Sequence, residues 1–154
     1  MSTITLAQLK ALEGQHFGTS DWFSIDQKRI DAFADVTEDW QFIHCDPEAA
    51  RETPFGGTIA HGFLTLSMLS AMVYQMPVLE GVAMGVNYGF DKVRFLSPVP
   101  AGARIRAHFT MKSVDDSKPG FITTIMAVSV EIEGQEKPAL AAEWIGRRYF
   151  GGDA

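Results

Sequence analysis

Hydrophobic residues follow two different patterns in the two halves of the chain. In the segment IAHGFLTLSMLSAMVYQM, residues 59–76, no residue is charged and the few hydroxyl side chains do not gather on one face. A helix that is apolar on all sides is typical of a protein core. Scattered polar residues and the stop at Pro77 argue against a membrane span, which needs about 20 predominantly apolar residues. We therefore predict a buried central helix and no membrane segment.

After this segment, apolar and polar residues alternate, which is typical of half-buried strands. The sequences VNYGFDKVRFL, RIRAHFTM, FITTIMAVSVEIEG and ALAAEWIGRRYF predict four antiparallel strands, and DDSKPG and EGQEKP supply turn residues. The alternation also predicts which residues of the two middle strands face the core: Ile105, Ala107, Phe109 and Met111 in one, and Ile122, Thr124, Met126, Val128, Val130 and Ile132 in the other.

The first half of the chain predicts shorter elements. TLAQLKALEG and SIDQKRIDAFADVTED have apolar residues at helical spacing, with Ser24 as the expected cap of the second helix. HFGTSDWFSI, between them, is expected to be extended. CDPEAARE predicts a helix of one or two turns, with Asp46 as its cap and Pro47 at its first position.

These elements predict an α+β fold. The economical packing is one curved antiparallel sheet wrapped around a helix at Gly62–Gln75, because one face of such a sheet can cover one helix. A chain of 154 residues suffices for a single domain, 1–154, and is short for two. The sheet leaves edge strands, and pairing them between two copies hides them. We therefore expect a homodimer.

The amino-acid composition limits which binding partners and which cellular compartment we expect. A net charge of -6, without a cluster of Lys and Arg, argues against nucleic acid as a partner. The single cysteine, Cys45, cannot form an internal disulfide, which favours a reducing compartment. The first residues lack the pattern of a signal peptide. We expect a cytoplasmic protein.

Asp39 and His44 are the first candidates for chemistry. Their spacing of five fits neither one helical turn nor one face of a strand, so they meet only if the chain bends between them. A carboxylate beside an imidazole orients the ring and suits acid–base work on a water molecule. From spacing alone, an acid at a helix end and an unrelated histidine explain the same residues.

Gly62 is the second candidate, at the expected start of the central helix. Unpaired N–H groups and the helix dipole favour negative charge there, and glycine allows a close approach, although a tight turn explains it as well. Ser70 lies about two turns further on and either shares that side or bonds to the helix backbone. His44, Asp46 and His61 match no common zinc spacing, so we predict no metal.

Two longer stretches add a family resemblance. DWQFIHCDPEAA followed by PFGGTIAHGFLTLSML resembles the MaoC-like dehydratase family, which includes the (R)-specific enoyl-CoA hydratases and the NodN-like proteins. NYGFDKVRFLSPVPAGARIRA is similar to a later signature of that family, and the resemblance runs from about Gly18 to Arg148. It implies the hot-dog fold, a long helix wrapped by an antiparallel sheet, which is usually dimeric with the active site near the subunit interface.

The resemblance also implies an activity. The reaction is the reversible syn addition of water to a trans-2-enoyl-CoA, a hydro-lyase reaction in which the CoA thioester is the substrate and no cofactor takes part. In that reaction Asp39 and His44 hold the catalytic water, the Gly62 amide contacts the thioester oxygen, and Ser70 helps to line the site. Two alternatives stay open: an acyl-CoA thioesterase, although Phe63–Leu69 offers no acid, and a non-catalytic NodN-like module that binds acyl groups.

Between Asp39 and His44 the sequence departs from the family pattern. Characterised hydratases of the family carry Asn-Pro-Leu there, whereas this chain has Trp-Gln-Phe-Ile, which is typical of the NodN-like branch. The substrate is therefore left open. The candidate substrate-binding residues are Trp40, Gln41, Ser70, Asn87 and Tyr88.

Overall fold

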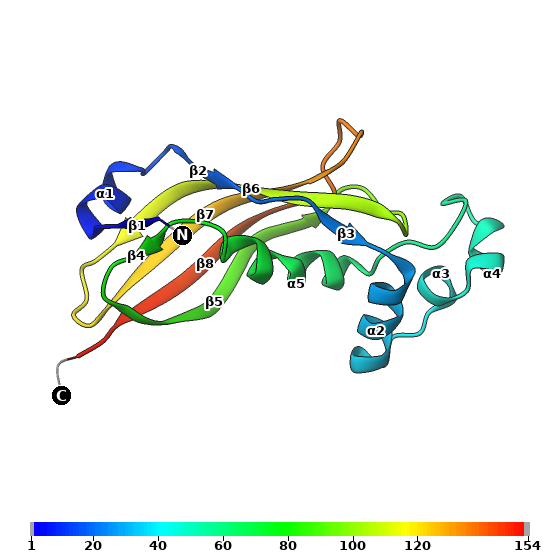
Figure 1. Ribbon diagram of the computed structural model, residues 1–154, viewed down its shortest axis with the longest axis horizontal. Helices are drawn as coiled ribbons and strands as arrows, with labels where there is room; N and C mark the ends of the chain where they lie inside the picture. The colour runs from blue at the N-terminus through cyan, green and yellow to red at the C-terminus, as the bar shows by residue number, and fades with distance from the viewer. Residues whose placement is uncertain (1, 153–154) are drawn as a thin grey trace.

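The computed structural model describes residues 2–152, so Met1, Asp153 and Ala154 of the predicted domain lie outside the described residues. Its main sheet contains the strands β2 (His16–Thr19), β3 (Phe23–Ile25), β5 (Val82–Phe95), β6 (Ala103–Asp115), β7 (Phe121–Ile132) and β8 (Leu140–Phe150). The strand order is β2-β6-β7-β8-β5, all neighbours are antiparallel, and β3 also pairs with β6. The helix α5 (Gly62–Val73) lies against the concave face of this curved sheet (Figure 1). The predicted α+β arrangement is confirmed.

The core is built from the inward faces of the strands, as the alternation predicts. Every residue predicted to face inward on β6 and β7 is at most 3% exposed. Except for the polar Thr124, they belong to one hydrophobic cluster with the buried side of α5. Burying each large aliphatic or aromatic side chain contributes about 1.5–3 kcal/mol, so this face anchors the position of α5.

The helix α5 is shorter than the apolar segment around it, and one of its sides is open. Leu64, Leu69 and Met72 are buried, but Phe63 is 67% and Tyr74 71% exposed. The prediction of burial on all sides is therefore wrong for the single chain, because the sheet covers only one side of the helix. No helix among the described residues is long and apolar enough to cross a membrane.

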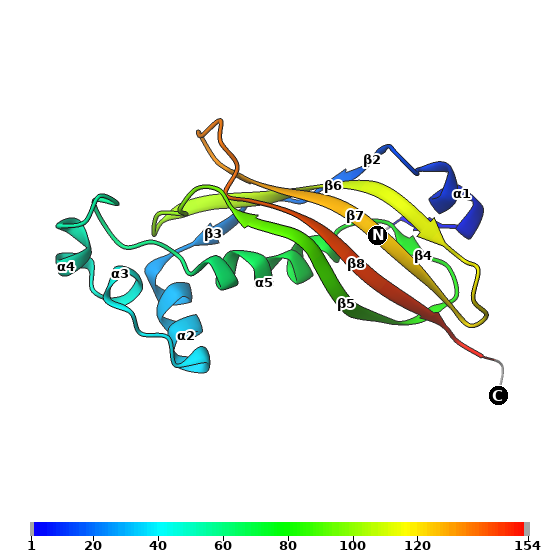
Figure 2. The same ribbon diagram turned by 180° about the vertical axis from the view of Figure 1, so that it is seen from behind.

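Three short helices extend beyond the sheet at one end of α5 (Figures 1 and 2). They are α2 (Gln27–Thr37), α3 (Phe42–Cys45) and α4 (Pro47–Arg51). Asp26 caps α2 by accepting the N–H of Arg29, at 2.8 Å. Ser24 is not the cap, because it lies in β3. Asp46 caps α4 as predicted, through the N–H of Ala49 at 3.0 Å.

The opposite end of the molecule contains elements that the hydrophobic pattern did not predict. The strand β1 (Thr3–Ile4) pairs in parallel with β4 (Val78–Leu79). Two residues are too few for an alternating pattern, so only their pairing defines these strands. The helix α1 (Leu6–Ala11) is where the sequence predicts one, and it packs Leu9 into the core.

Candidate active site

The chain turns back on itself between α2 and α3. Glu38 adopts a left-handed conformation, with φ of 59°, and ends α2. The Asp39 carboxylate then accepts the backbone N–H of Gln41 at 3.4 Å, a weak bond of the kind Asp makes in turns. Three residues later, α3 carries His44 back toward the end of α2. This bend is what the spacing of Asp39 and His44 requires for the two side chains to meet.

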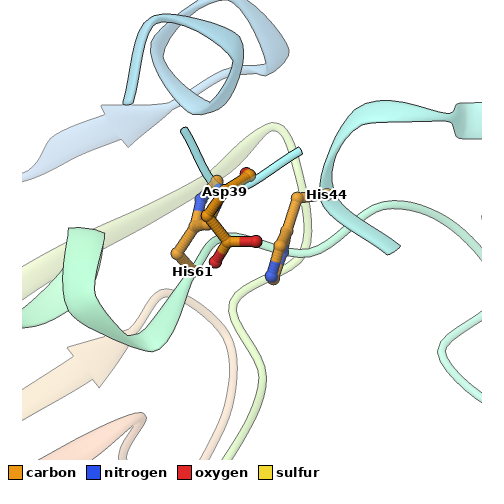
Figure 3. Close-up of side chains that lie close together, drawn as sticks. All are labelled: Asp39, His44 and His61. Carbon is orange, nitrogen blue, oxygen red and sulfur yellow. The ribbon is translucent and has the colours of Figure 1, made fainter. Parts of the chain in front are cut away.

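Asp39 and His44 do come together, and His61 joins them (Figure 3). One side-chain ligand atom from each of the three residues lies within 4.8 Å of the other two. His44 is 6% and His61 2% exposed, whereas Asp39 is open to solvent. The cluster therefore joins two desolvated imidazoles to one carboxylate that solvent can reach.

The hydrogen bonds of His44 define its tautomer. Its Nδ1–H donates to the carbonyl oxygen of Ile59 at 2.7 Å, so in the neutral ring Nε2 carries the lone pair. Burial lowers the pKa of His44, and the neighbouring His61 lowers it further, against the opposing effects of the Ile59 carbonyl and the Asp39 carboxylate. At neutral pH the ring is therefore uncharged and able to accept a proton.

His61 is the residue whose place in the site the sequence analysis missed. Its ring stacks on that of His44, with the centroids 3.8 Å apart, and its Nε2–H donates to the backbone carbonyl of Asp39 at 3.0 Å. It thereby holds the end of α2 against the start of α5. Among the described residues, its buried Nδ1 has no hydrogen-bond partner. The sequence feature that could have identified His61 is its position directly before Gly62.

We expect the lowered pKa of His44 to appear in the pH dependence of activity. The acidic limb of kcat/KM should fall below the ordinary histidine value of 6.5, because protonating a buried ring beside a second imidazole is unfavourable. Replacing His61 with Gln removes the second imidazole and should move the limb upward. A limb at or above the ordinary value in the unchanged protein would show that the Asp39 carboxylate outweighs desolvation.

Gly62 begins α5 beside this cluster, as predicted. No side chain caps this end of the helix, so its first N–H groups keep their capacity to bind a negative ligand. A cavity of about 240 Å³ lies here, lined by His44, Gly62, Thr65 and Phe95 among others. A Cβ on residue 62 would lie 3.0 Å from the ring of Phe95, so the close packing of that ring requires glycine.

Ser70 and Asn87 do not lie at this cavity. Both line a second cavity of about 280 Å³, further along α5. Ser70 itself is exposed in the single chain. The structure therefore separates Ser70 and Asn87 from the cavity that His44 and Gly62 line.

The other candidate binding residues lie on the surface. The Trp40 side chain is 56% exposed, and its indole N–H donates to Asp35 at 2.8 Å. Gln41 begins α3 without a side-chain capping bond. Tyr88 is 59% exposed and lies under the Arg147 guanidinium, 3.9 Å from the ring centroid. Neither cavity is lined by Trp40, Gln41 or Tyr88.

Cysteine chemistry is not favoured at this site. Burial raises the pKa of the Cys45 thiol, and the neighbouring carboxylates of Asp31 and Asp35 raise it further. The thiol therefore stays protonated, which makes it a poor nucleophile. Asp46, which we considered as a metal ligand from its sequence position, instead caps α4.

A family model described as the MaoC like domain matches residues 8–133. The chain belongs to the MaoC-like family. Nodulation protein N of Rhizobium meliloti is 49% identical to this MaoC-like protein over 97% of the chain and 94% of that protein. The 3-hydroxyacyl-thioester dehydratase Z of Mycobacterium tuberculosis is 46% identical over 93% of the chain and 95% of the dehydratase.

A solved structure of an (R)-hydratase from A. caviae, involved in PHA biosynthesis, has the same fold. It aligns with a TM-score of 0.73 at 24% identity, over 87% of this chain and 94% of that one. The MaoC-like protein therefore has the hot-dog fold, as the resemblance implied. Named relatives of this family include both dehydratases and hydratases, the two directions of a hydro-lyase reaction.

Proposed function

We propose that this MaoC-like protein is an (R)-specific enoyl-CoA hydratase and dehydratase. It adds water reversibly, in the syn sense, to a trans-2-enoyl-CoA thioester and forms the (R)-3-hydroxyacyl-CoA. The observation that carries the proposal is the convergence of Asp39 and His44 beside the open helix start at Gly62. The names of the relatives support the same reaction class, because dehydration of a 3-hydroxyacyl thioester is this reaction in reverse.

In the hydration direction, Asp39 and His44 hold one water molecule against C3 of the enoyl group. The pair accepts a proton from the water as its oxygen bonds to C3, and it returns a proton to C2 on the same face. One water is consumed, and the C2–C3 double bond becomes a single bond. The two groups interact closely, so the proton belongs to the pair during the reaction.

The start of α5 acts on the other end of the conjugated system. As the water oxygen bonds to C3, negative charge develops on the thioester oxygen. The Gly62 N–H, at the positive end of the helix dipole, donates to that oxygen and stabilises the enolate-like transition state. A donor fixed before the reaction needs no reorganisation, which is why such groups contribute strongly to rate.

The assay is the hydration of crotonyl-CoA and longer enoyl-CoAs, followed by loss of the absorbance of the conjugated thioester. Turnover that yields the (R)-3-hydroxyacyl product supports the proposal. Release of free CoA thiol would instead identify a thioesterase. A well-folded protein that turns over no enoyl chain length would identify a module that only binds acyl groups.

We expect the activity to be independent of metal ions. Asp39, His44 and His61 are close enough to share a cation, but the proposed reaction uses the imidazole lone pair and a water molecule directly. Treatment with EDTA should leave kcat unchanged. A loss of activity that Zn²⁺ restores would contradict this and would assign the cluster to a metal.

A homodimer accounts for the open side of α5, and we propose it as the working form. Phe63 and Tyr74 of α5 are exposed, as are Met84 and Val86 of the edge strand β5. Exposed apolar residues near an unpaired strand edge are typical of an interface. A second copy of the chain supplies both an apolar cover and a partner edge.

Placing a charge on this face should separate the two copies. The wild-type protein is expected to have twice the chain mass of 16.9 kDa by light scattering, and Val86→Glu should shift it toward one chain, since a buried carboxylate is costly. Val36→Glu is the matched control, because Val36 is 80% exposed and lies on α2, outside the sheet. A monomeric wild-type protein would refute the homodimer.

A further inference from the structure

The second cavity has a lining suited to a chain with an anionic end. It lies between the second half of α5 and the strands β5, β7 and β8, and its volume is about 280 Å³. Much of the lining is apolar, including Val73, Leu79, Val82 and Met126. The charged residues of the lining are Arg147 and Arg148, and no Asp or Glu is among the described residues that form it.

Arg148 lies on the inner face of β8, which otherwise builds the core. Its guanidinium donates to the hydroxyl of Thr124, an inward residue that is 0% exposed. A Cβ on residue 146 would lie 3.6 Å from Nη1 of Arg148, so the absence of a side chain at Gly146 leaves room for the guanidinium. The Arg148 side chain therefore lies on the inner face of the sheet, where its partner is the uncharged hydroxyl of Thr124.

Among the described residues, no carboxylate compensates the charge of Arg148. Burial lowers its pKa, and no neighbouring charge contributes to that shift. The arginines of the outer sheet face differ, since Arg104 pairs with Glu133 and Arg106 with Glu131. Removing an unpaired cation from water is unfavourable, so an anion that reaches Arg148 gains a strong, charge-assisted contact.

An unsatisfied donor lies in the same lining. Trp144 is 5% exposed, and its Nε1–H is buried with no acceptor among the described residues. Ser70 and Asn87 add a hydroxyl and an amide. Buried donors are normally paired, so their presence beside an empty volume indicates a ligand with oxygen acceptors.

Both cavities are lined by residues of α5 and of β5. Gly62 and Phe95 line the first cavity, and Ser70 and Asn87 line the second. Gly62 precedes Ser70 on α5, whereas Asn87 precedes Phe95 on β5, so the two elements contribute to the two cavities in opposite chain order. The eight residues from Gly62 to Ser70 advance about 12 Å along the helix, a distance that a medium-length acyl chain spans.

We infer that the second cavity binds the far end of the acyl chain, and that Arg148 selects chains that end in a carboxylate. The substrate class is the CoA thioester of an unsaturated dicarboxylic acid, with methylene groups against the apolar lining and the terminal carboxylate on the guanidinium. The inference rests on the proposed function, because that function places the thioester at Gly62.

The turnover experiment compares trans-2-octenedioyl-CoA with trans-2-octenoyl-CoA, which differ in having a carboxylate or a methyl group at the far end. The corresponding ten-carbon pair tests chain length. Wild-type kcat/KM should favour the dicarboxylic substrate, and Arg148→Met should lower it for that substrate by about tenfold to a hundredfold while sparing the monocarboxylic one. Arg148→Lys should retain part of the preference. Arg104→Met is the matched control and should retain all of it.

Binding of saturated thioesters separates this inference from the proposed reaction. By calorimetry, suberyl-CoA should bind the wild-type protein more tightly than octanoyl-CoA, and Arg148→Met should abolish the difference. Turnover of octenoyl-CoA without any preference for the dicarboxylic chain would overturn the inference and leave the hydratase standing. Selective binding of suberyl-CoA without turnover would support the inference and overturn the hydratase. Dissociation of the dimer by Arg148→Met, with selectivity unchanged, would assign Arg148 to the interface.

Discussion

Asp39→Asn and His44→Ala should each lower kcat/KM for crotonyl-CoA hydration by about 10²- to 10⁴-fold, the range expected for a general acid–base group. Asn keeps the size of the Asp39 side chain and its capacity to accept the Gln41 N–H, but it cannot carry a proton to or from water. Ala at position 44 removes the Nε2 lone pair that the bond to Ile59 leaves available. Initial rates with crotonyl-CoA measure both losses.

The matched control is Asp46→Asn. Asp46 is close in sequence to His44, but its role is to cap α4, and Asn caps helices about as well as Asp. This variant should retain wild-type kcat/KM. The double variant of Asp39 and His44 should lose little more than either single variant, because the two residues act as a unit. Activity retained in either single variant, with an intact fold by circular dichroism, would remove that residue from the mechanism.

Gly62→Ala should lower kcat by about 10²- to 10³-fold, as the loss of one donor to a developing oxyanion does. The added Cβ would lie 3.0 Å from the Phe95 ring, so either the ring or the start of α5 must shift. Ala keeps the backbone N–H, so the loss arises from the changed position of this N–H or of the ring beside it. The same rate assay, run across substrate concentrations, separates kcat from KM.

Gly57→Ala is the matched control for this change, because a Cβ at that position meets no atom within 4 Å. Adding Phe95→Leu to Gly62→Ala should restore part of the activity if ring displacement causes the loss. An unchanged kcat in Gly62→Ala would show that the rate does not depend on the close packing of Phe95 against the start of α5.

Much of the fold was predictable because it depends on local periodicity. The alternation in residues 104–111 and 121–134 correctly assigned the inward faces of β6 and β7, since a strand places neighbouring side chains on opposite faces. The cap and proline at the start of α4 were also predictable, because their signals are local. The two-residue strands β1 and β4 were not, as their identity depends on pairing across the molecule.

The candidate site, like the fold, was predictable only in part. Asp39, His44 and Gly62 were found from residue type, spacing and a family resemblance, but their meeting depends on the left-handed turn at Glu38. His61 was noticed only as a possible ligand, because nothing local predicts that its ring stacks on that of His44. Similarly, no local pattern separates Ser70 and Asn87 from the cluster and assigns them to a second cavity.

The sequence by itself determined the apolar helix, the inward faces of the strands and the residue types available for acid–base chemistry. Each of these follows from the order of side chains within a few turns or one strand. Only the tertiary structure decided which side of α5 stays open, that His61 stacks on His44, and that Arg148 lines a cavity to which the described residues contribute no carboxylate. These features depend on contacts between segments far apart in the chain. Such contacts determine how buried each group is and how far it lies from its partners, and both determine its chemistry.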